Sequence, residues 1–97
     1  MRYMFHYAHS FNQPLGKWNV SNVRDMEAMF CLAQEFDQPL DGWDVSKVMD
    51  FSSMFKQAIK FNQSLRSWRV HPDSKRKDMF FYATSFDTNQ NMFVVQE

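Results

Sequence analysis

Apolar side chains recur along this chain at a constant step of 25 positions, and no insertion breaks the register from Met4 to Val95. Polar and small residues fill the positions between them. The largest recurring sets are Trp18, Trp43 and Trp68; Met4, Met29, Met54 and Met79; Phe5, Phe30, Phe55 and Phe80; Phe11, Phe36, Phe61 and Phe86. A fixed period of this length is typical of solenoids, in which each repeat forms one coil that stacks on the next.

Each unit opens with an alternating segment. In the first copy, Leu15-x-x-Trp18-x-Val20 has the spacing of a leucine-rich repeat strand, with tryptophan in place of the second leucine. Alternation places Trp18 and Val20 on one face and polar residues on the other. We therefore expect short strands near 17–20, 42–45 and 67–70, stacked into a parallel sheet, and a final strand from Phe93 and Val95.

The period then changes. Met26, Met29 and Phe30 follow one another at helical or 3₁₀ spacing. Asp25 and Asp50 precede these apolar groups, where the N-cap of a helix would lie. The pattern predicts one short helix per coil, of about two turns at most.

Two polar columns close each unit. Their members are Asn12, Asp37, Asn62 and Asp87, followed by Gln13, Gln38 and Gln63. Stacked side chains of this kind satisfy turn backbone groups that no neighbouring strand reaches, so we expect polar ladders with a structural role. The third unit departs from the pattern, with Asp73, Lys75 and Arg76 at valine, aspartate and apolar positions, and is expected to bulge.

Length and composition support one small domain. The 97 residues divide into units of about 1–14, 15–39, 40–64 and 65–89 and a partial unit 90–97. Eleven Phe, eight Met and three Trp fall mainly in the repeat columns, where a solenoid core requires large side chains. Fold and domain organisation therefore follow from the repeat: one solenoid domain spanning 1–97.

Charge and targeting signals exclude several classes of protein. Lys plus Arg equals Asp plus Glu at 11 each, so no overall field favours nucleic acid or an anionic membrane. A single cysteine cannot form an internal disulfide, and no apolar run is long enough to span a bilayer. The N-terminus shows no signal peptide, so the localisation stays open.

The repeat W-[DN]-V-S-x-V-x-D-M-x-x-M-F-x-x-A-x-x-F-[ND]-Q-P-L resembles the BspA-like leucine-rich repeat family. The segments FNQPLGKWNVSNVRDMEAMF and FDQPLDGWDVSKVMDFSSMF are similar nearly throughout to the branch found in Mycoplasma surface lipoproteins and in algal and microbial proteins of unknown function. The resemblance covers almost the whole chain. It implies an α/β repeat: a leucine-rich-repeat-like right-handed solenoid of about four coils with short parallel strands and short helices. It also implies a surface for protein interaction or adhesion, with no catalytic residues.

The strand face opposite the core is the first candidate binding surface, on analogy with other solenoids. We call it the polar strip. It comprises Lys17, Asn19 and Ser21; Gly42, Asp44 and Ser46; and Ser67, Arg69 and His71. Its mixed charge suits recognition of a protein surface, and the alternative is an ordinary solvated face.

Other candidate groups favour structural explanations. The basic run Lys75-Arg76-Lys77 has no interleaved aromatic residue, so a solvated loop is favoured over a nucleic-acid site. His6 and His9 lack a neighbouring acidic or cysteine ligand and are interpreted as surface residues. Cys31 is expected to be a semi-exposed helix residue. We expect no catalytic residue, no metal ligand and no cofactor.

The ends of the coil stack are the second candidate surface. A solenoid exposes its apolar core at each terminus unless a cap covers it. Phe5 lies at one end and Phe93 at the other, and an exposed strand edge there would pair with another chain. The sequence therefore favours a non-enzymatic interaction or scaffold module that docks through its ends, through end-to-end association or within a larger complex. The alternative is cell-surface adhesion or carbohydrate recognition.

Overall fold

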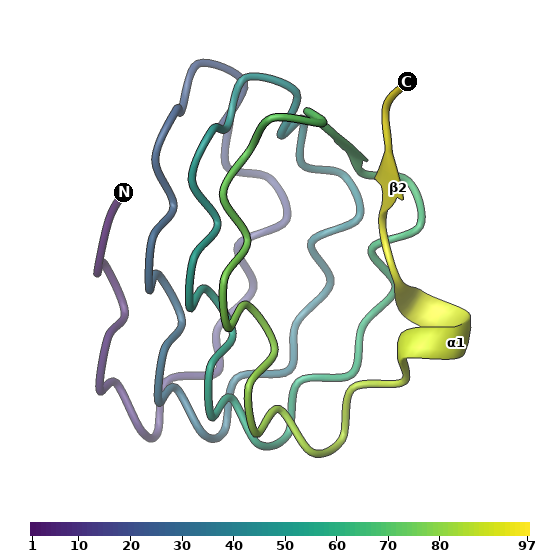
Figure 1. Cartoon of the computed structure of the whole chain (residues 1–97). Helices are drawn as coiled ribbons and strands as arrows, with labels where there is room; N and C mark the ends of the chain where they lie inside the picture. Colours follow the sequence, from purple (N-terminus) through teal and green to yellow (C-terminus); the bar gives the residue numbers. More distant parts are fainter.

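A computed structural model describes all of residues 1–97 (Figure 1). The chain winds into successive coils that lie side by side, with the N-terminus at one end of the row and the C-terminus at the other. The molecule measures 35 × 27 × 23 Å. Parallel bridges join Asp25 to Asp50 and Asp50 to Lys75, so residues one period apart in sequence are neighbours in space.

Regular secondary structure is sparse. Strand β1 (Arg69–Val70) pairs in parallel with strand β2 (Val94–Val95), with Arg69 opposite Val94 and Val70 opposite Val95. The single helix, α1 (Thr88–Asn91), begins after the N-cap Asp87, whose side chain accepts hydrogen bonds from the backbone of Asn89 and Gln90. No helix in the structure combines the length and the apolar character that crossing a lipid bilayer requires.

The prediction of a short helix in each coil is wrong. Residues 26–33 form consecutive reverse turns, closed by hydrogen bonds from the N–H of Met29 to the carbonyl of Met26 and from Ala33 to Phe30. Asp25 does cap the segment, because its Oδ1 accepts the N–H of Glu27 at 2.9 Å. The backbone after this cap is not helical, since the third residue of each turn has a positive φ.

Eight non-glycine residues with positive φ define these turns: Tyr3, Tyr7, Ala28, Leu32, Ser53, Gln57, Asp78 and Tyr82. Such a backbone is unfavourable for residues with a Cβ atom. In the first three coils, however, it aims each N–H along the row, where it donates to a carbonyl of the next coil at 2.7 to 3.0 Å, as Ala28 does to Ser52. Six hydrogen bonds between coils thus replace the bonds that a helix would make within itself.

Replacing Ser53 (φ 58°) by glycine should therefore stabilise the fold. Glycine adopts positive φ without steric cost but loses more backbone entropy, so the expected net gain is about 0.5 kcal/mol. Urea denaturation of S53G and of the neighbouring S52G variant measures it. Ser52 is not among the positive-φ residues, so S52G should be destabilised, and equal effects of the two changes would contradict this explanation.

Two of the expected strands, 17–20 and 42–45, do not form. Between 17–20 and 42–45 a local side-chain bond takes the required donor, because the N–H of Ser46 donates to Oδ1 of Asp44 at 3.0 Å. Gln96 occupies the corresponding place beyond β2, and with valine at position 94 its N–H reaches the carbonyl of Val70 instead. Between 42–45 and 67–70 no strand pairing forms either, although Arg69 stands in the Asn/Asp column.

The core is one cluster of 22 buried residues running from Leu15 to Phe86. Aromatic rings from successive coils stack in register, as in the rows that join Phe30 to Phe55 at 5.5 Å and Trp43 to Trp68 at 6.5 Å. Each buried indole also donates to the preceding coil, from Trp43 to the Leu15 carbonyl and from Trp68 to the Leu40 carbonyl. The aromatic columns are therefore core in the interior coils.

The predicted polar ladder is confirmed. Oδ1 of Asn12, Asp37 and Asn62 each accepts the backbone N–H of the residue 25 positions later, at 2.9 to 3.0 Å. Gln38 and Gln63 add amide bonds to the same oxygens of the preceding coil. At the last step Asn91 of α1 supplies the amide that bonds to Asn62, which ends the ladder.

Candidate functional site

The structure places the polar strip along one flank of the coils. Asn19, Asp44 and Arg69 are exposed, as is Lys17, whereas Ser46 and His71 are half-buried. These residues belong to three neighbouring coils. The strip thus exists as a row, but several of its polar groups are already engaged in local hydrogen bonds.

Asp44 and Arg69 illustrate this engagement. Oδ1 of Asp44 accepts both the N–H and the hydroxyl of Ser46, at 3.0 and 2.7 Å. The guanidinium of Arg69 folds back and donates to the carbonyl of Arg66 at 2.9 Å. The strip therefore presents constrained polar groups on a fixed backbone.

The hydrogen bonds from Ser46 lower the pKa of Asp44, the side-chain bond most and the backbone bond next, with a smaller contribution from the positive charge of Lys47. Because the folded pKa lies below the unfolded value, the ionised form favours the folded state. That contribution is present above the unfolded pKa and is lost as the pH falls through the folded pKa.

Replacing Ser46 by alanine should raise the pKa of Asp44, because the hydrogen bond from the Ser46 hydroxyl is the largest cause of its lowering. A carboxyl-carbon NMR titration of the wild type and of S46A measures the change. The matched control is Ser21→Ala, which removes the same hydroxyl one coil earlier beside an uncharged partner. An unchanged Asp44 titration in S46A would contradict the assignment.

The ends of the row of coils place Phe5 and Phe93 half-buried rather than fully exposed. Phe5 stacks on Phe11 at 4.2 Å and on Phe30 at 5.5 Å, and Phe93 stacks on Phe80 at 6.3 Å. The exposed apolar side chains at the ends lie around them. Four belong to the N-terminal side (Tyr3, Met4, Tyr7 and Trp18) and four to the C-terminal side (Phe81, Tyr82, Val94 and Val95).

Trp18 is the largest of these, and its expected place in the core with the rest of the tryptophan column is wrong. Its indole is 40% exposed, whereas Trp43 and Trp68 in the same column are 4% and 1% exposed. It forms the wall of a hollow of about 450 Å³, together with Pro14, Gly16, Lys17 and Pro39. The sequence does contain a signal for this exposure: Trp18 is the first tryptophan of its column, so no earlier tryptophan stacks on its outer side.

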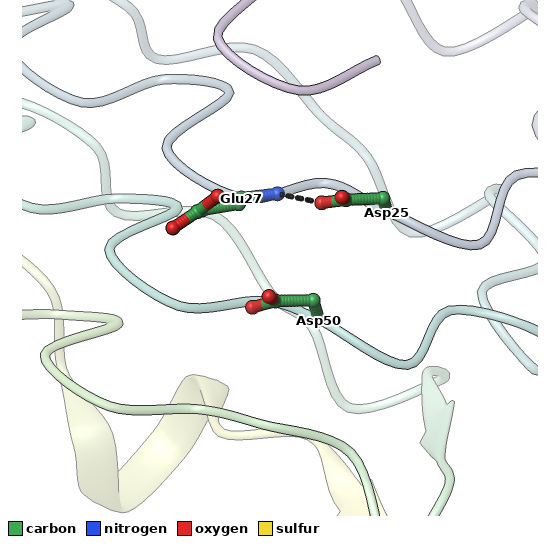
Figure 2. A group of neighbouring side chains, drawn as sticks. All are labelled: Asp25, Glu27 and Asp50. Carbon is green, nitrogen blue, oxygen red and sulfur yellow. Dashed lines mark hydrogen bonds between the residues drawn. The ribbon is translucent and has the colours of Figure 1, made fainter.

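An acidic group also lies where sequence reasoning proposed only helix caps. Figure 2 shows Asp25 and Glu27 on one coil and Asp50 on the next, and one oxygen of each lies within 4.8 Å of the others. Arg2 approaches Asp25 at 3.9 Å and Glu27 at 4.0 Å, which offsets part of their charge. Asp25 and Asp50 are one period apart, and this spacing could have predicted from the sequence that their carboxylates lie close together on neighbouring coils.

The remaining candidates have structural surroundings. Cys31 is buried rather than semi-exposed and lies in a turn rather than a helix; burial raises the pKa of its thiol, partly opposed by the charge of Lys56. His6 and His9 flank Tyr7 in edge-to-face contacts. In the basic run, Lys75 keeps the backbone bridge to Asp50.

These features define a protein of stacked 25-residue coils, whose distinctive surfaces are a polar flank and two apolar ends. A family model described as "Mycoplasma protein of unknown function, DUF285" matches residues 1–93, so the chain belongs to that family. No curated protein and no solved structure matches it. The expected relation to Mycoplasma proteins is thereby confirmed at the level of the family.

Proposed function

We propose that this chain is a non-enzymatic protein-interaction module with a leucine-rich-repeat-like, right-handed solenoid fold of about four coils. In this proposal it is a structural subunit that docks into a larger assembly through its ends. The parallel bridges between equivalent residues of neighbouring coils support the solenoid fold. The relation to BspA-like leucine-rich repeat proteins, suggested by the repeat motif, belongs to the same proposal.

One observation carries the proposed function. Met4 at the N-terminal end is 51% exposed, although Met29 and Met54 in the same column are fully buried. Trp18 shows the same contrast with Trp43 and Trp68. A side chain that the interior coils bury is thus left in contact with water at the end, and apolar patches of this kind commonly mark protein interaction sites.

The polar strip is a second docking surface within the same proposal. Its residues are held by turns with fixed hydrogen bonds, which favours recognition by a preformed surface. Charge reversal at Asp44 and Arg69 would weaken a complex formed by the strip. Polar substitution at Phe5 or Phe93 would weaken one formed by the ends.

Site-specific photo-crosslinking in the cells that produce the protein tests the proposed function. A photoreactive amino acid is placed at Tyr7 or Tyr82 at the ends, at Asp44 in the strip, and at Met49 as an exposed control position elsewhere. We expect crosslinked protein from the end positions and none from Met49. Crosslinks from none of the end or strip positions would refute the interaction module.

A second candidate, carbohydrate recognition, rests on the hollow beside Trp18. An exposed indole next to Lys17 and two prolines offers an apolar platform with a charged neighbour, which suits a sugar ring. Indole fluorescence titrated with a panel of oligosaccharides tests it, with Trp18→Phe as the variant that should lose the response. If the fluorescence of the wild type responds to no oligosaccharide in the panel, carbohydrate recognition is rejected and only the protein-interaction proposal remains.

A further inference from the structure

The exposed apolar residues are distributed unevenly. Nine large hydrophobic side chains are exposed, and eight of them lie at the two ends; Met49 is the exception. At the C-terminal end Val95 is 39% exposed, although Val20, Val45 and Val70 in the same column are 2% exposed or less. At the ends, Met4, Trp18 and Val95 therefore expose side chains whose equivalents the interior coils bury, whereas Val94 belongs to a column that is exposed in every coil.

The hydrogen-bonding groups at the two ends are complementary. Inside the molecule the N–H groups of Ser53, Phe55 and Gln57 donate to carbonyls of the next coil at 2.7 to 2.9 Å. In the last coil the equivalent donors belong to Asp78, Phe80 and Tyr82, and none has a backbone acceptor. In the first coil the equivalent acceptors, the carbonyls of Arg2, Met4 and His6, receive no backbone donor. One end thus carries three free donors and the other three free acceptors at matching spacing.

We propose that the partner of these ends is a second copy of this chain, docked head to tail, with its first coil seated on the last coil of the first copy. The proposal rests on the proposed function and names its partner. The three donors of Asp78, Phe80 and Tyr82 then meet the carbonyls of Arg2, Met4 and His6 of the second copy. The new interface continues the interface that the chain already builds between its own coils.

The repeat register of the two copies is compatible with this junction. Met1 shares its column with Met26, Phe51 and Arg76, so residues 1–14 of the second copy are in repeat register with residues 76–89, on which they would stack. Residues 92–97 lie along β1 and would belong to the same layer as residues 1–14 of the second copy. No coil has to be displaced for the second copy to enter the row.

Aromatic stacking would continue across the junction. Phe80 lies in the column of Phe5, so the two rings of the two copies repeat the internal stack of Phe30 on Phe55 at 5.5 Å. Phe93 meets Trp18 of the second copy, in the column where Trp43 stacks on Trp68 at 6.5 Å. The exposed indole of Trp18 is thereby covered by a ring.

One column opposes the contact. Lys77 shares a column with Arg2 and Glu27, and inside the chain Arg2 lies 4.0 Å from Glu27. At the junction Lys77 would instead face Arg2 of the second copy, and the two positive charges repel. Association should therefore strengthen with added salt, and Lys77→Glu, which restores the internal charge pattern, should tighten it roughly twofold to fivefold at low salt.

Because the two contacting surfaces differ, the interface is heterologous and does not close on itself. The purified chain should form open, concentration-dependent oligomers that lengthen into filaments. A symmetric dimer that stops growing is a different outcome and would overturn the proposal. The native mass at increasing concentration, measured by light scattering and sedimentation, separates the two, with circular dichroism confirming the fold.

Two substitutions block one end each. Met4→Arg places a charge on the N-terminal face, and Val95→Arg does so on the C-terminal face. Their matched controls are Met49→Arg, at an exposed methionine away from the ends, and Val94→Arg, the neighbour of Val95 in the exposed column of Asn19 and Asp44. We expect monomers of 11.7 kDa from both blocked variants and oligomers from both controls. Equal loss in the controls would overturn the proposal.

Mixing the two blocked variants provides the decisive measurement. Each keeps one free face, so an equimolar mixture of Met4→Arg and Val95→Arg should form dimers of twice 11.7 kDa and no larger species. A mixture that stays monomeric would refute head-to-tail docking. If Val95→Arg does not fold, the effect of Lys77→Glu tests the same junction independently, and no tightening at low salt counts against it.

Failure of the head-to-tail proposal can be distinguished from failure of the proposed function. A folded wild-type monomer at all concentrations, combined with crosslinks in cells to a different protein, would overturn the second copy as partner and leave the interaction module standing. Crosslinks from Tyr82 of one copy to the first coil of another would support both.

Discussion

Phe55→Ala should cost about 3–5 kcal/mol of folding free energy, the largest effect expected of a single substitution in this chain. The Phe55 side chain is fully buried in the middle of the row of coils. Its ring contacts Phe61 at 4.2 Å within its coil, and Phe30 and Phe80 at 5.5 and 5.6 Å in the coils on either side. Alanine therefore leaves a cavity that three coils share, and urea denaturation monitored by circular dichroism measures the loss.

The matched control for Phe55→Ala is Phe81→Ala. Phe81 is 41% exposed and its ring lies 5.7 Å from Nζ of Lys56, so its removal leaves no enclosed cavity. The expected cost is below about 1 kcal/mol. Comparable losses in the two variants would mean that the phenylalanine column is not the structural core.

Asp37→Ala should destabilise the fold by about 2 kcal/mol, the second largest effect we expect. Oδ1 of Asp37 accepts the backbone N–H of Asn62 at 3.0 Å and the side-chain amide of Gln63 at 2.9 Å. Alanine removes the acceptor from both donors at once, and the turn into the next coil loses its tie to the previous one. Thermal and urea unfolding of the variant measure the effect.

The column itself supplies the control for this substitution. Asn12 and Asn62 make the same contact with an amide oxygen, so Asp37→Asn should stay within about 0.5 kcal/mol of the wild type. A large loss in Asp37→Asn would show that the charge of Asp37, rather than the position of its oxygen, stabilises the ladder.

The periodic columns carried most of what could be predicted from the sequence. Residues 25 positions apart are neighbours in space, the tryptophan and phenylalanine columns are buried in the interior coils, and the Asn/Asp column forms the expected ladder. In the third unit, where a bulge was expected, the turn closes from Ser74 to His71, one residue later than the turn from Val48 to Val45, and the register is kept at Lys75. A column at a constant period indicates contact between coils whatever the local backbone.

The local backbone was predicted less well, and for one reason. The apolar spacing of Met26, Met29 and Phe30 fits a helix and a run of turns equally well. The positive φ of Ala28 and Leu32 distinguishes the run of turns from a helix. Neither residue is a glycine, the residue type that would have indicated positive φ from the sequence. The hydrogen bonds that stabilise this conformation join separate coils, so a pattern confined to one coil does not contain them.

The candidate site also has one part that the repeat predicted and one part that it did not. The ends followed from the repeat itself, since a row of coils has two terminal faces. The acidic group of Asp25, Glu27 and Asp50 and the exposure of Trp18 depend on which residues of one coil meet the next, and on where the tryptophan column begins. Both become visible only when the coils are placed beside one another.

The identical junction between coils bears on how such a chain can change in length over generations. A duplication or loss of one 25-residue unit in the gene would add or remove a whole layer. The new junction would bring together the same side chains as the old one: tryptophan on tryptophan, phenylalanine on phenylalanine and Asn on Asp. Recombination between the units therefore meets little structural penalty. Populations that carry this gene should differ in the number of its units more readily than in their spacing.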